Sequence, residues 1–164
     1  MFVPCSGRAA PRRSVLLRHS LADRMSRDKR SALMSKVRGR NTRPEMQVRR
    51  ALHAAGLRFR LHQRHLPGNP DIVLPGIRTI VFVHGCFWHG HECPKGQRRP
   101  NSNIAFWGEK LDRNGIRDQR VQADLVEAGW QVKIVWECDL TDGLSALVEE
   151  LILLRARRRV HRLD

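Results

Sequence analysis

The segment FVHGCFWHGHECPKG (82–96) concentrates side chains that could bind a metal ion. Its possible ligands are two cysteines and two histidines in close succession: Cys86, His89, His91 and Cys93. Cys138 directly follows a strand-like run at 130–137. If this strand lies beside the one at 78–84, Cys138 reaches the same loop. Three cysteines and one histidine then form a closed tetrahedral site, which is typical of structural Zn²⁺.

Two questions about this site stay open at the level of the sequence. His89 and His91 compete for the single imidazole position, and the cysteines could instead be reduced, buried residues with unrelated histidines nearby. Cys5 lies apart from the others, in an irregular N-terminal segment. Nothing in the chain indicates a secreted protein, so we do not expect a disulfide framework.

A second group of residues could hydrolyse a phosphodiester. Asp71 begins a strand-like run, and His84 and His89 follow the next strand, one hairpin away. A carboxylate that holds Mg²⁺ and a histidine that activates water are the minimal parts for this reaction. A lone aspartate at such a place is otherwise a turn or cap residue. Glu45 has two interpretations: it is spaced as a capping-box partner of Thr42, or it is a carboxylate of the same cleft.

Large aromatic side chains lie in the metal-binding segment and beyond it. Phe87 and Trp88 stand among polar loop residues, and Trp107 lies near the start of a long helix with a basic face. Such side chains can enter a base step of DNA and unstack it, although packing against a sheet is the alternative. Trp130 and Trp136 belong to a strand, and we expect them in the core.

The chain carries 31 Lys and Arg against 16 Asp and Glu, a formal charge of +15. A small domain this basic is expected to bind nucleic acid, with a membrane surface as the second possibility. Part of the charge could merely solvate the tails. No apolar run approaches the roughly 18 residues of a membrane span, and no secretory signal is evident.

A length of 164 residues fits one domain. We expect that domain at 25–158, preceded by a disordered extension (1–24) and followed by a basic tail (159–164). The character of the sequence changes at Met25, so translation could start there rather than at Met1.

Periodicity and turn residues predict an α/β fold. The expected elements are a short basic helix at 29–39, a helix at 41–57 ending near Gly56, strands at 57–62, 70–74 and 78–84, a helix at 104–128, a strand at 130–137 and a helix at 145–159. The dipeptide Pro75-Gly76 marks a turn. The strand reached through a helix should run parallel to a strand of the preceding meander, which gives a mixed sheet flanked by helices.

The motifs LPGNPDIVLPGIRTIVFVHGCFWHGHEC, FWGEK and GWQVKIVWEC resemble the very-short-patch-repair (Vsr) DNA mismatch endonucleases over about residues 26–140. HGCFWH and VWEC are specific to that family. The resemblance implies a restriction-endonuclease-like fold with a structural zinc site. It also implies an enzyme that nicks one DNA strand beside a T·G mismatch, the product of 5-methylcytosine deamination, and so initiates very short patch repair.

The resemblance implies roles for individual residues. Asp71 corresponds to the Mg²⁺-binding aspartate and His89 to the catalytic histidine, the proposed general base. His84 corresponds to a second active-site histidine and Glu45 to a glutamate of the N-terminal helix. Val83 stands where a threonine is usual; its backbone carbonyl would bind Mg²⁺, while any hydroxyl role would be lost.

The remaining correspondences concern the loop. The zinc ligands implied are Cys86, His91, Cys93 and Cys138, and the intercalating aromatics implied are Phe87, Trp88 and Trp107. Gly90 and Glu92 replace histidines, neither of them assigned as a ligand, and residues 1–24 have no counterpart.

The resemblance also sets the expected setting and its alternatives. We expect a monomer that acts on mismatched double-stranded DNA in the nucleoid of a bacterial cytoplasm, with mismatch-repair proteins as further partners and no membrane contact. One alternative is a restriction-type nuclease of the same fold with a different target. The other is a zinc-stabilised DNA-binding module without catalysis.

Overall fold

The structure is a computed structural model that describes residues 26–35, 39–100 and 103–160. The predicted N-terminal extension (1–24), with Cys5, lies outside the described residues, as do Met25 and positions 161–164 of the predicted basic tail.

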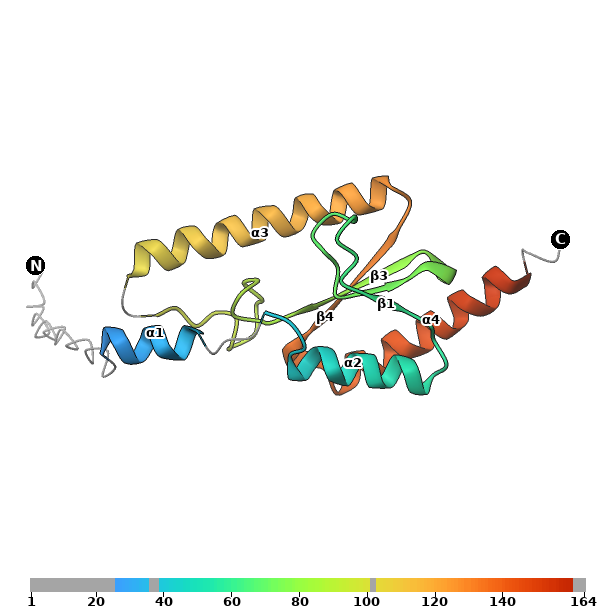
Figure 1. Ribbon diagram of the computed structural model, residues 1–164, viewed down its shortest axis with the longest axis horizontal. Coiled ribbons are helices and arrows are strands. Elements are labelled where there is room, and N and C mark those ends of the chain that lie inside the picture. The colour runs from blue at the N-terminus through green and yellow to red at the C-terminus, as the bar shows by residue number, and fades with distance from the viewer. Residues whose placement is uncertain (1–25, 36–38, 101–102, 161–164) are drawn as a thin grey trace, which may run out of the picture.

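A four-stranded mixed sheet forms the centre of the fold, as predicted (Figure 1). Its strands, in spatial order, are β1 (Arg60–Leu61), β2 (Ile72–Leu74), β3 (Thr79–His84) and β4 (Gln131–Trp136). β1, β2 and β3 pair antiparallel, whereas β4 runs parallel to β3 with Val83 opposite Val135. The parallel pair brings the C-terminal ends of β3 and β4 to one edge of the sheet. The loop that contains His89 and the predicted zinc ligands begins there.

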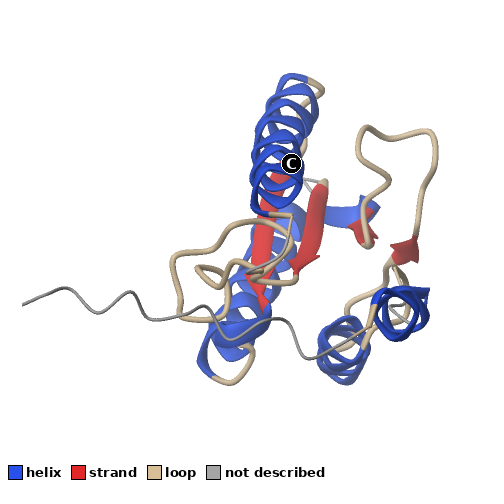
Figure 2. Cartoon of the chain, turned by 90° about the vertical axis from the view of Figure 1, so that its left-hand side faces the viewer, coloured by secondary structure: helices blue, strands red, loops and turns tan. Residues whose placement is uncertain are grey.

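Helices cover both faces of this sheet. They are α2 (Arg43–Ala54), α3 (Ile104–Glu127) and α4 (Asp142–Val160), whereas α1 (Arg27–Ser35) precedes them and lies at the left of Figure 1. In Figure 1, α3 lies above the sheet, while α2 and α4 lie below it. Figure 2 views the chain from the left-hand end of Figure 1 and shows the strands between helices on either side. The architecture therefore has three layers.

Alternation along the strands explains the three layers. One buried cluster joins the sheet to α2 and α4 through Val81, Leu52 and Leu151. A second cluster joins the other face to α3 through Phe82 and Leu125. Because successive strand residues point to opposite faces, β3 places Val83 toward α2 and His84 toward α3. Two different surfaces thus meet at the end of one strand.

The predicted strand at 57–62 is much shorter in the structure. Leu57 is buried and its N–H donates to the Leu52 carbonyl at 2.9 Å, so it finishes the end of α2 instead of starting a strand. Gly56, at φ 68°, supplies the expected left-handed stop. At the other end, His62 adopts φ 45°, which ends the pairing of β1.

Two smaller differences between the predicted and the observed elements have local causes. The predicted Pro75-Gly76 turn forms a 3-10 helix, Pro75–Ile77, before β3. β2 begins at Ile72 and not at 70, because Pro70 has no N–H and the Asp71 side chain accepts the Val83 N–H. Among the described residues, no helix combines the length and apolar character needed to cross a membrane.

Candidate functional site

A cleft of about 620 Å³ opens where the C-terminal end of β3, the N-terminus of α2 and the middle of α3 meet. Its lining includes six residues that the sequence singled out: Glu45, Asp71, Val83, His84, Trp88 and His89. Two basic residues, Arg40 before α2 and Arg117 on α3, also line it. The structure therefore brings the predicted acid, the predicted histidines and cationic groups into one cavity.

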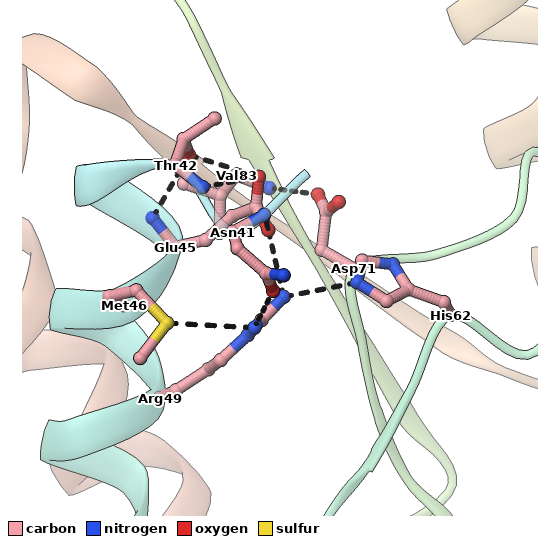
Figure 3. Close-up of polar contacts among 8 residues, drawn as sticks. All are labelled: Asn41, Thr42, Glu45, Met46, Arg49, His62, Asp71 and Val83. Carbon is pink, nitrogen blue, oxygen red and sulfur yellow. Dashed lines mark hydrogen bonds and ion pairs between the residues drawn. The ribbon is translucent and has the colours of Figure 1, made fainter. Parts of the chain in front are cut away.

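Asp71 lies at the entrance to β2 with its carboxylate turned toward β3. Its Oδ2 accepts a hydrogen bond from the Val83 N–H at 2.9 Å (Figure 3). Burial raises the pKa of Asp71, the Val83 hydrogen bond opposes that rise, and the nearby charge of Glu45 adds to it. The N–H and C=O of one strand residue point to the same side, so the Val83 carbonyl is directed toward the side of Asp71. A cation between these two oxygens would relieve the buried charge.

Glu45 completes the predicted capping box at the start of α2. Thr42 accepts from the Glu45 N–H, and Glu45 Oε1 accepts from Thr42 Oγ1 at 2.9 Å. Its second oxygen, Oε2, accepts from the Asn41 N–H at 3.0 Å and from Arg49 Nη2 at 2.8 Å (Figure 3). The capping interpretation is confirmed. Every one of these donors belongs to α2 or the loop before it, so the buried carboxylate fixes the helix N-terminus against the cleft.

His84 and His89 stack face to face, with ring centroids 3.8 Å apart and an interplanar angle of 8°. Burial, followed by the proximity of His89, lowers the pKa of His84 to about 4. His84 is therefore neutral at pH 7, and its buried Nδ1 has no hydrogen-bond partner in the part of the chain that the structure describes. Such an atom favours a polar ligand in the cleft.

Asp118 of α3 is a candidate site residue that sequence reasoning missed. Its Oδ2 lies 2.5 Å from His89 Nδ1. Burial alone would raise the pKa of Asp118, but hydrogen bonds from His89 and Arg117 lower it overall. An ionised carboxylate only accepts, so Nδ1 of His89 carries the proton of this hydrogen bond, and Nε2 is the ring nitrogen left for other partners. The arrangement is that of a general base with an orienting carboxylate. Its position in the sequence gave no signal, because it lies off the basic face of this helix, about a third of a turn away.

The four predicted zinc ligands come together in a separate cluster. The donor atoms of Cys86, His91, Cys93 and Cys138 all lie within 4.8 Å of one another. Cys138 follows β4 and its Sγ lies 3.4 Å from His91 Nδ1. The register of β3 and β4 produces this meeting, as the sequence anticipated. The two histidines separate: His91 joins the cysteines, while His89 faces Asp118.

The cysteine cluster has the chemistry of a metal site. A hydrogen bond from His91 lowers the pKa of Cys93 to about 6, whereas burial raises that of Cys86 to about 12. The loop folds back so tightly that a Cβ on Gly96 would lie 2.0 Å from the His91 carbonyl oxygen. Trp136, expected in the core, is half-buried and stacks on His91 at 4.3 Å. Sulfur and nitrogen donors in this number fit a closed tetrahedral site.

The loop aromatics pack on the start of α3 and on one another. Phe87 lies 5.0 Å from Trp88 and 5.6 Å from Trp107, measured between ring centroids. Trp107 is only 9% exposed, whereas its neighbour Phe106 is 50% exposed. The Lys110 ammonium lies within 5.7 Å of the rings of Trp88, Phe106 and Trp107. The cluster borders the cleft through Trp88.

Comparison with known proteins gives a consistent result. Residues 22–95 match the family described as DNA mismatch endonuclease Vsr. The type II nicking enzyme V.XorIIP of Xanthomonas oryzae pv. oryzae is 52% identical over 131 residues, which are 80% of this chain and 95% of that relative.

Two further relatives are similar over most of their lengths. The type II nicking enzyme V.NmeAIP of Neisseria meningitidis serogroup A is 41% identical over 137 residues, with 80% of this chain and 97% of the relative covered. The protein named DNA mismatch endonuclease Vsr in Escherichia coli K12 is 39% identical over 135 residues, with 82% and 85% covered.

Proposed function

The chain belongs to the Vsr family of DNA mismatch endonucleases, and from this premise we propose that it nicks one strand of DNA beside a T·G mismatch. Such mismatches arise by deamination of 5-methylcytosine, and the nick would initiate very short patch repair. The single observation that carries this proposal is the meeting of Asp71 with the His89–Asp118 pair in one cleft. A carboxylate for a cation and an oriented base for water are what phosphodiester hydrolysis requires.

We propose that Asp71 and the Val83 carbonyl hold Mg²⁺ in the cleft. When bound, the ion would neutralise charge on the scissile phosphate. His89 Nε2 accepts the proton of the attacking water, and Asp118 stabilises the imidazolium that results. His84 stays neutral and packs the base in place through its stacked ring. Glu45 supports the site by holding the start of α2, and the products are a 5′-phosphate and a 3′-hydroxyl.

The Asp118→Asn variant tests the role of the missed carboxylate. We expect the single-turnover nicking rate to fall roughly a hundredfold, because His89 loses both its orienting acceptor and the charge that favours its protonated form. Asp112→Asn, an exposed aspartate on the same helix, is the matched control. Equal rates for the two variants would remove Asp118 from the mechanism.

We propose that Phe87 and Trp88, supported by Trp107, enter the DNA next to the mispair. A T·G wobble pair is more easily unstacked than a matched pair, so deformability contributes to discrimination. The position of Trp88 at the cleft and its edge-to-face contact with the half-buried Phe87 support this role. The basic side chains of α3 would contact the DNA backbone.

The Phe87→Ala variant tests the wedge. We expect the preference for T·G over T·A duplexes to fall about tenfold, within the range measured for aromatic stacking on bases. The fluorescence increase of a 2-aminopurine placed beside the mispair should also shrink. Ile116→Ala, which removes an exposed side chain elsewhere on α3, should change neither signal. An unchanged preference in Phe87→Ala would contradict the wedge.

We further propose that the cysteine cluster holds one structural Zn²⁺, which braces the loop between Cys86 and Cys93. Its four protein ligands leave no position for water or substrate, so this ion would not take part in the chemistry. The proposed partner is double-stranded DNA, bound by a monomer in the bacterial nucleoid. Mismatch-repair proteins are candidates for later recruitment.

One assay separates this proposal from its two alternatives. Both strands of a duplex are labelled, and cleavage is followed with and without Mg²⁺. The proposed function gives a nick in a single strand, only beside the mismatch. A restriction-type enzyme would cut both strands of fully paired DNA, and a DNA-binding module would cut neither.

A further inference from the structure

A buried arginine links the N-terminus of α2 to a histidine of the cleft. Arg49 is 7% exposed. Its Nη1 donates to Asn41 Oδ1 at 2.6 Å, and its Nη2 donates to Glu45 Oε2 at 2.8 Å. The same Nη2 lies 3.2 Å from His62 Nε2 (Figure 3). Neither Arg49 nor His62 belongs to a motif that the sequence makes evident.

The contact with Arg49 fixes where the proton of His62 lies. A guanidinium stays protonated and offers only donors, so His62 Nε2 must accept. The proton of the neutral ring is then on Nδ1. Among the described residues, Nδ1 has no hydrogen-bond partner, although the ring lines the cleft. His62 therefore presents one free N–H donor with a defined direction.

The backbone of His62 is held in an uncommon conformation. Its φ of 45° lies in the left-handed region, which is unfavourable for a residue with a side chain. The conformation turns the chain away from β1 and brings the ring to the wall that also contains Asp71 and Glu45. Figure 3 shows the ring beside Asp71, with Arg49 reaching it from α2. Strain of this kind, at a cleft, favours a functional placement.

The ligand of this donor follows from the chemistry of the cleft. The Asp71 carboxylate already receives the Val83 N–H, and Glu45 is satisfied by its own helix and Arg49. The acceptors that enter the cleft in the proposed reaction are phosphate oxygens of the DNA strand. A neutral N–H can bind a phosphate oxygen without adding another charge next to Arg49.

We propose that His62 is a DNA-binding residue, whose Nδ1–H donates to a backbone phosphate of the strand that enters the cleft beside Asp71. Arg49 is its positioning residue, because it holds Nε2 and so sets the tautomer and direction of the ring. This inference rests on the proposed function in one respect only: that DNA occupies this cleft. It does not depend on mismatch recognition or on the metal.

Two substitutions test the two ring nitrogens of His62 separately. His62→Gln places an amide near Nε2, keeps the Arg49 contact and removes the donor at Nδ1. His62→Asn places its amide near Nδ1, and asparagine tolerates a positive φ well. We expect His62→Gln to weaken binding to a fully paired duplex roughly tenfold, with an unchanged unfolding temperature, and His62→Asn to recover part of the loss. The control is His65→Gln, an exposed histidine outside the cleft.

A phosphate scan tests the contact itself. Single phosphates of a fully paired duplex are replaced, one at a time, by neutral methylphosphonates, and binding is measured without divalent metal. The wild type should lose affinity at the contacted phosphate, while His62→Gln should show no further loss there. Additive losses at every phosphate would overturn the proposal. Because no nicking is measured, this result is independent of a failure of the mismatch activity.

The salt dependence of binding distinguishes a neutral donor from a cation. His62→Gln should leave the slope of log affinity against log salt unchanged, since a neutral imidazole releases no counterion. Arg117→Gln should reduce that slope by about one. A reduction by about one in His62→Gln would contradict the assigned tautomer. Arg49→Met should lower affinity as His62→Gln does, and the double variant should lose no more than the worse single variant.

Discussion

Replacing Asp71 by Asn should abolish nicking and leave the metal-free fold at least as stable as the wild type. The loss of activity follows from removing the cleft carboxylate that we propose holds the cation. We expect a decrease of about a thousandfold or more in the single-turnover rate, as for other groups that stabilise developing charge. The amide retains an oxygen for the Val83 N–H, so the local backbone should not move.

The gain in stability follows from the raised pKa of Asp71. Burial makes the folded protein bind this proton more strongly than the unfolded chain does. The stability of the wild type therefore decreases as pH rises above the ordinary range for aspartate, through the raised pKa. Asp71→Asn should lose that component of the decrease. Denaturant unfolding with a chelator, at several pH values between about 3.5 and 7, measures it.

The exposed Asp124→Asn on α3 serves as the control for both effects. It should keep wild-type nicking and the wild-type pH dependence of stability. Substantial nicking by Asp71→Asn would show that the cation is held elsewhere. A variant less stable than the wild type would show that the Asp71 carboxylate is better solvated than its place in the cleft indicates.

Among the substitutions proposed here, Cys138→Ser should produce the largest decrease in the free energy of unfolding. Its thiol comes from the segment after β4, and the other three donors come from the loop after β3. A metal ion at this cluster would tie the two chain segments together across the sheet edge. If the ion is present at a thousand times its dissociation constant, its loss removes about 4 kcal/mol of stability. The unfolding temperature should fall by many degrees, and nicking should fall because the loop carries His89.

Metal analysis and thermal unfolding check this expectation together. The wild type should contain about one zinc per chain, consistent with one closed four-ligand site. Cys138→Ser should contain little, and a chelator should reproduce its instability in the wild type. Cys5→Ser, which alters a cysteine that the proposed ligand set does not include, should keep both the metal and the unfolding temperature. If Cys138→Ser retained full zinc and stability, the ligand set would be wrong.

The features predicted well from the sequence were local ones or followed from strand order. Three of them depend only on neighbours in the chain: the capping box of Thr42 and Glu45, the end of α2 at Gly56, and the helix α3. The meeting of Cys138 with the loop depends on β3 and β4 being parallel neighbours, which a helical crossover favours. Both kinds of information are present in spacing and periodicity.

The features that were missed depend on contacts across space. Asp118 reaches His89 only because α3 packs over the end of β3, and no spacing rule connects the two residues. His62 meets Arg49 because its backbone adopts φ 45°. The presence of a histidine in the sequence does not predict this conformation. The aromatic cluster shows the same limit: nothing in FWGEK predicts that Trp107 is buried and Phe106 exposed.

The most direct test of the central claim is the single-turnover nicking rate with Mg²⁺ on two duplexes that differ in one base, T·G and T·A. Both strands carry labels, and the flanking sequence is varied across a panel. We expect one strand of the T·G duplex to be nicked beside the mispair, with little cleavage of the T·A duplex and none by Asp71→Asn. Equal cleavage of the two duplexes, or no cleavage of either, would contradict the account.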